Sequence, residues 1–131
     1  MPAPVFAGTA LLQGGVSVSK RHLHILWTNA DPDTGKLMVM MYAKYSMQNQ
    51  WWDKVTVILW GATTRLMAEN GEMQREMARL RRDYGVEFVG CITCAKELGV
   101  AEQLEALGVE LKPWGPPLTE LLQTGAPLLS V

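Results

Sequence analysis

The sequence predicts an α/β fold, a three-layer α/β/α sandwich around a mainly parallel sheet of about five strands. Short apolar segments rich in β-branched residues alternate along the chain with longer helix-forming segments. The segment 54–60 is almost continuously apolar, as is typical of a parallel strand that is buried on both faces. Glycine or proline marks most of the junctions, which favours short connections between successive elements.

The first strand–helix unit is expected at residues 22–48. Residues 22–28 form the strand, and the turn-rich segment 29–35 follows. Residues 36–48 are a strong helix-forming stretch that is apolar on nearly every face. A small monomer cannot bury such a helix completely, so we expect it to form a subunit interface in a homo-oligomer.

The second unit begins with the strand 54–60, which ends at Gly61. Helical sequence runs from about Thr63 to Tyr84 and is interrupted at Asn70-Gly71. Its second half has an amphipathic stripe at helical spacing, formed by Met73, Met77, Leu80 and Tyr84.

The rest of the chain continues the alternation of strands and helices. The expected strands are 86–90, 109–112 and 128–131, and the expected helices are 91–98, 101–107 and 116–123. Gly99, Gly108 and Gly125 follow these helices, and Pro116 begins the last one. These placements predict a parallel sheet with helices on both faces.

The length of 131 residues fits one domain, which we place at 22–131 after an N-terminal arm at 1–21. The net charge of −1 argues against nucleic acid and acidic membranes as partners. The apolar stretch 5–12 lacks a preceding basic residue, and glycines interrupt it far short of a membrane span. We therefore expect a soluble, cytoplasmic protein.

Function is expected at the carboxyl ends of the strands, where the loops of a parallel sheet converge. The candidate residues are Trp27, Asn29 and Asp31 after the first strand, Trp60 and Thr63 after the second, Cys91 and Cys94 after the third, and Trp114 after the fourth. The aromatic residues either shape a binding pocket or simply cap the ends of the sheet.

The pair Cys91 and Cys94 is the most specific chemical signal in the chain. It lies at a strand-to-helix junction, where backbone N–H groups and the helix dipole stabilise a thiolate. Cysteines three residues apart in a helical turn have Cα atoms about 5–6 Å apart, which permits a disulfide. Cys91 directly follows its strand, so we expect it to be the more reactive thiol and Cys94 to modulate it. The alternative is a pair of inert, buried cysteines.

No metal or cofactor is expected. A zinc site needs two ligands besides the cysteines, and His22 and His24 lie at the opposite end of a strand, roughly 16 Å away. The sequence also lacks a glycine-rich phosphate loop and a nucleophile-elbow serine.

Several segments, in this order and spacing, resemble the DsrE-like (DsrE/DsrF/TusD-type) family over about residues 22–131. They are 23–29 before a long helix, Trp51-Trp52-Asp53-Lys54-Val55-Thr56 before the second strand, 91–100, and the ending 117–122 with Gly125. The resemblance implies the α/β/α sandwich and a homo-oligomer, commonly a trimer or a hexamer of stacked trimers.

The resemblance also implies a mechanism for the cysteine. In the sulfur-relay branch of the family, one cysteine accepts a sulfane sulfur as a persulfide and passes it to a partner protein. Its interval to a Gly-Val-like pair matches that from Cys91 to Gly99-Val100, so Cys91 takes this role. Cys94 has no such counterpart, and a thiol within reach of a persulfide can expel sulfide and leave a disulfide.

The leading hypothesis is therefore a sulfurtransferase-like protein with a persulfide on Cys91. Trp27, Asn29, Trp60 and Trp114 would shape the pocket, and a sulfur-donor or sulfur-acceptor protein would be the partner. Two alternatives stay open. One is a non-catalytic oligomeric module that binds a small ligand, and the other is a thiol redox protein that uses the cysteine pair.

Overall fold

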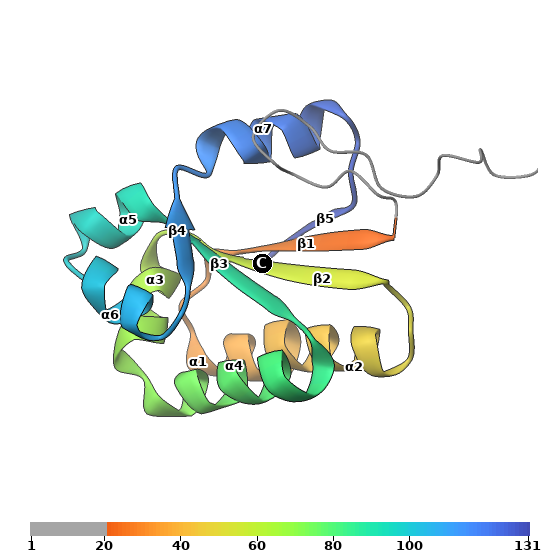
Figure 1. The fold of residues 1–131 in the computed structure, drawn as a ribbon, viewed down its shortest axis with the longest axis horizontal. Helices are drawn as coiled ribbons and strands as arrows, with labels where there is room; N and C mark the ends of the chain where they lie inside the picture. The colour runs from red at the N-terminus through yellow and green to blue at the C-terminus, as the bar shows by residue number, and fades with distance from the viewer. Residues whose placement is uncertain (1–20) are drawn as a thin grey trace, which may run out of the picture.

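The computed structural model describes residues 21–131, so the expected arm at 1–21 lies, apart from Arg21, outside the described residues. A sheet of five parallel strands has the order β4-β3-β2-β1-β5 (Figure 1). The strands are β1 His22–Trp27, β2 Lys54–Leu59, β3 Glu87–Cys91, β4 Glu110–Lys112 and β5 Leu128–Ser130. The predicted fold class is confirmed.

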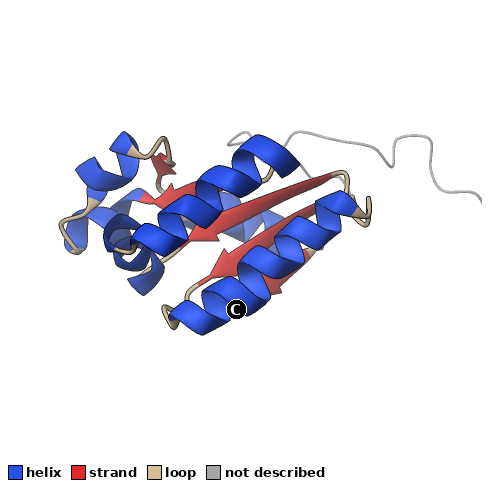
Figure 2. Ribbon diagram, turned by 90° about the horizontal axis from the view of Figure 1, so that it is seen from below, coloured by secondary structure: helices blue, strands red, loops and turns tan. Residues whose placement is uncertain are grey.

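One face of the sheet carries the helices that connect the first four strands. They are α1 Pro32–Thr34, η1 Gly35–Met40 and α2 Met41–Gln48 after β1, α3 Ala62–Glu69 and α4 Gly71–Tyr84 after β2, and α5 Ile92–Glu97 and α6 Ala101–Ala106 after β3. Figure 2 shows this face from below, with helices lying over the strands. None of the helices within 21–131 is long and apolar enough to cross a membrane.

The opposite face carries α7, Gly115–Gln123 (Figure 1). The connections from β1 to β4 all step in one direction across the sheet, whereas the connection from β4 to β5 steps back past β1. Since parallel crossovers are right-handed, a step in the reverse direction places its helix on the other face. We call this surface of the sheet the α7 face.

The first long helix starts earlier than the expected residue 36. Asp31 caps it, since the Oδ2 atom of Asp31 accepts a hydrogen bond from the N–H of Thr34 at 2.9 Å. The helix then passes through a widened π-helical segment, η1, that starts at Gly35. Gly35 lies against the indole of Trp27, so close that a Cβ atom at this position would be 2.6 Å from Cζ2 of Trp27.

Candidate thiol site

Cys91 is the last residue of β3 and the residue that precedes α5. Its side chain lies on the α7 face and is 4% exposed. It belongs to a buried cluster that also contains Ile58, Val89, Trp114 and Leu121. The Cys91 thiol is therefore enclosed by apolar side chains.

Cys94, in the first turns of α5, is half-buried and packs against the same cluster. Burial is the main cause that raises the pKa of the Cys94 thiol. A hydrogen bond to the Cys91 side chain and the charge of Cys91 raise this pKa further. Hydrogen bonds from the backbone N–H groups of Gly61 and Cys94 act in the opposite direction. Both cysteines are free thiols, and they lie close enough to interact. Cys94 is the more exposed of the two cysteines, and Cys91 is buried.

Thr63 fixes the turn that brings Gly61 to Cys94. The Thr63 hydroxyl accepts a hydrogen bond from the N–H of Trp60 at 2.9 Å and donates one to the carbonyl of Trp27 at 2.6 Å. It thereby joins the carboxyl ends of β1 and β2, while Gly61 takes a φ of 66°, a region that favours glycine. Thr63 is fully buried and holds this turn in place.

Trp27 does not shape a pocket beside the cysteines. It is 0% exposed and belongs to the main core, beneath the helices of the opposite face. Its indole N–H donates to the carbonyl of Asn29 at 2.8 Å. Side chains alternate between the two faces along β1, and Leu23, Ile25 and Trp27 all face the main core. This alternation explains why Trp27 lies away from the cysteines.

Asn29 and Asp31 are exposed and organise the loop after β1. The N–H of Asp31 donates to Oδ1 of Asn29 at 2.9 Å, and Asp31 caps the following helix. The two side chains therefore have turn-forming roles. Of the predicted site residues, the buried cluster on the α7 face brings together Cys91, Cys94, Trp60 and Trp114.

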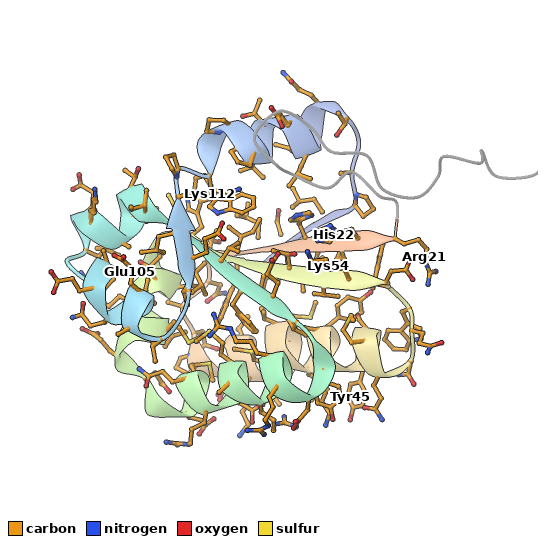
Figure 3. All side chains as sticks on the ribbon, viewed as in Figure 1. Arg21, His22, Tyr45, Lys54, Glu105 and Lys112 are labelled. Carbon is orange, nitrogen blue, oxygen red and sulfur yellow. The ribbon has the colours of Figure 1, made fainter. Side chains whose placement is uncertain are left out.

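Sequence reasoning missed a buried polar network at the amino end of the same face. Nε2 of His22 is 2.7 Å from Oγ1 of Thr56, which donates to Oε1 of Glu87 at 2.8 Å. The ring centroids of His22 and His24 are 4.1 Å apart with the rings tilted by 31°, and the His24 ring centroid is 6.3 Å from that of Trp114. Figure 3 shows His22 on the side of β1 that faces α7. The sequence contained one indication of this network. His22 and His24 are two residues apart, so they face the same side of the strand as Leu26.

Burial lowers the pKa of both histidines, to about 4 for His22 and about 3 for His24. They are thus neutral near pH 7. Within 21–131, no three or more His, Cys, Asp or Glu side chains are grouped so that they could hold a metal ion.

Comparison with known proteins gives a structural relative. No family model and no curated protein matches the chain. A solved structure, described as a conserved protein of unknown function, BT1422 from Bacteroides thetaiotaomicron, superposes with a TM-score of 0.82 and 35% sequence identity. The match covers 87% of this chain and 97% of that chain. The chain belongs to the BT1422 family.

Membership in the BT1422 family rests on both the fold and the sequence identity, over nearly the whole of BT1422. The description of BT1422 names no activity. Membership in the BT1422 family therefore indicates the fold and assigns no function.

Proposed function

We propose that this chain is a DsrE-like sulfurtransferase-type protein that carries sulfane sulfur as a persulfide on Cys91. The observation that carries the proposal is the pairing of two free, interacting thiols after a parallel strand, one enclosed by apolar side chains and one partly exposed. An apolar enclosure keeps water away from a reactive sulfur. The exposed neighbour lies where a partner molecule can arrive.

The loading step is a thiol–persulfide exchange. The Cys91 thiolate attacks the outer sulfur of a donor persulfide, a new S–S bond forms on Cys91, and the donor S–S bond breaks. The donor leaves as a thiolate, so sulfane sulfur moves with no net oxidation. Attack by the Cys94 thiolate on the Cys91 sulfur would instead expel hydrosulfide and leave a Cys91–Cys94 disulfide.

The test is intact-mass analysis after incubation with a sulfane-sulfur donor. We expect the wild type and Cys94→Ser to gain one sulfur atom on Cys91, and Cys91→Ser to form no persulfide. The persulfide should last longer in Cys94→Ser because the thiol that expels sulfide is absent. A wild-type protein whose mass does not change would contradict the proposal.

A thiol redox protein is the second candidate, and the interaction between the two thiols favours it. In that reaction the pair loses two electrons and two protons to an added oxidant such as diamide, and a disulfide forms. The same mass measurement separates the two functions. A redox protein loses two hydrogens with diamide and gains no sulfur from the persulfide donor.

We also propose a homo-oligomer, a trimer or a hexamer, assembled through the outer face of η1 and α2. This apolar face contains the exposed side chains Leu37, Met38, Met41, Tyr45 and Trp51. Together with Tyr42 they line a shallow cavity of about 240 Å³. A second copy would cover side chains that are otherwise in contact with water.

Replacing Leu37 by Glu is expected to dissociate the oligomer, because it places a charge on this apolar face. Leu37 is 58% exposed, so the fold of the subunit should be unaffected. Leu122 is 62% exposed on α7, and Leu122→Glu is therefore the matched control. Light scattering should give a lower mass for Leu37→Glu alone. A monomeric wild type at micromolar concentration would exclude the assembly.

We place the protein in the cytoplasm. Two free thiols close enough to interact are maintained in a reducing compartment, and a sulfur-donor or sulfur-acceptor protein would be met there. Fractionation of cells that express the tagged protein tests this location.

A further inference from the structure

The indole N–H of Trp114 is a buried hydrogen-bond donor that lacks an acceptor. The Trp114 side chain is 3% exposed, and its Nε1 atom has no partner among the residues that the structure describes. An indole N–H can only donate, and buried donors in folded proteins are normally paired. The position therefore calls for an acceptor that arrives with a ligand or a modification.

The ammonium group of Lys112 brings a positive charge close to the Trp114 ring. It is the register partner of Cys91 in the β3–β4 pair, and side chains of parallel partners point to the same face. The Lys112 Nζ atom lies 4.9 Å from the centre of the Trp114 ring. Figure 3 places Lys112 at the end of β4 from which the chain continues into α7.

The electrostatics of His24 agree with this position. Burial is the main cause that lowers the pKa of His24, and the charges of His22, Lys54 and Lys112 add to it. The Lys112 ammonium group thus acts on the α7 face, where both histidines lie. Cys91 and Trp114 belong to one buried cluster on that face. The residues that carry a thiol, an unpaired N–H donor and an ammonium group are therefore neighbours on this face.

We propose that Trp114 and Lys112 hold the outer sulfur of a persulfide on Cys91, on the side of the sheet covered by α7. This inference rests on the proposed function. The ionised outer sulfur is a hydrogen-bond acceptor with a negative charge, so it satisfies the indole N–H and pairs with the ammonium group. Without the added sulfur, the Cys91 thiol provides neither this acceptor nor this negative charge. The site is therefore selective for the sulfur-loaded state of Cys91. Loading adds one sulfur to Cys91 by the exchange described above, and the donor thiolate leaves.

The test measures how strongly Cys91 retains sulfur. Cys94→Ser protein is equilibrated with mixtures of glutathione persulfide and glutathione, and the loaded fraction is read from intact mass. Trp114→Phe keeps the ring and removes the N–H, and Lys112→Gln keeps the length and removes the charge. Each is expected to lower the exchange constant about tenfold, the effect of one lost hydrogen bond to a charged group. Trp52→Phe and Lys36→Gln, on the opposite face of the sheet, are the controls.

A second readout needs no substitution of Trp114 or Lys112. The indole N–H resonance of Trp114 in ¹⁵N-labelled Cys94→Ser protein is expected to shift on loading, whereas the resonances of Trp27, Trp51 and Trp52, on the opposite side of the sheet, stay in place. Normal loading with an unshifted Trp114 resonance and unchanged constants in both variants overturns the inference and leaves the proposed function standing. Failure of the parent protein to take up sulfur overturns both.

Discussion

Lowering the pH from 7 to 5 is expected to reduce the free energy of unfolding by on the order of 3 kcal/mol, because two buried histidines gain protons on unfolding. The pKa of His22 is lowered to about 4 and that of His24 to about 3, mainly by burial. Lys54 disfavours the charged form of both, and Glu87 partly offsets this for His22.

The loss of stability at low pH follows from the lowered pKa values of both histidines. Above pH 6.5, the ordinary histidine pKa, both states are neutral and the stability is at its full value. Between pH 6.5 and about pH 3, the lower of the two folded pKa values, the unfolded chain binds more protons than the folded one, so stability falls as the pH falls. The loss levels off once the folded histidines are protonated as well.

Urea denaturation at a series of pH values measures this loss. The double variant His22→Gln/His24→Gln removes both titrating groups, so its stability should change much less between pH 7 and pH 5, whatever its stability at pH 7. If the free energy of unfolding depends on pH equally in the wild type and the double variant, other groups cause the acid sensitivity.

Gly35→Ala is expected to destabilise the fold by about 1–3 kcal/mol, the usual cost of an extra methyl group in a full core. The new Cβ atom would lie 2.6 Å from Cζ2 of Trp27 and 3.3 Å from the sulfur of Met73. Both neighbours are fully buried and have little freedom to move. The better helix propensity of alanine offsets only about 0.5–1 kcal/mol of this cost.

Gly115→Ala is the matched control for Gly35→Ala. Gly115 also lies in a helix, at the start of α7, and an added Cβ atom would have no neighbour within 4 Å. Thermal unfolding should show a lower midpoint for Gly35→Ala and an unchanged or slightly higher one for Gly115→Ala. Equal midpoints would mean that η1 moves away from the sheet at no cost.

The fold was largely predictable because strands and helices leave local, periodic patterns in the sequence. The apolar run 54–60 predicted β2, Lys54–Leu59, and Asn70-Gly71 separated α3 from α4 as expected. The strand order was not predictable, because the pairing of β5 with β1 joins segments about a hundred residues apart through packing alone.

The thiol site was predictable only in part. The edge of the sheet follows from topology, so Cys91, Cys94, Trp60 and Trp114 were found together. The error over Trp27 came from considering its distance along the strand and ignoring its phase, which directs it to the other face. The link from His22 through Thr56 to Glu87 needs the register of three strands, which no local pattern contains.

The reversal of direction between β4 and β5 also sets an order for folding. Strands β1 to β4 lie beside one another in the order of the chain, so each can pair with the strand that directly precedes it in the sequence. β5 pairs with β1, which is on the far side of the sheet from β4. We expect α7 to pack on the sheet only when this last pairing forms. Since Trp114 and Leu121 enclose Cys91 from this segment, the thiol is expected to be the last part of the core to become protected. During synthesis and refolding, Cys91 would pass through a period of exposure to oxidants that the finished fold prevents.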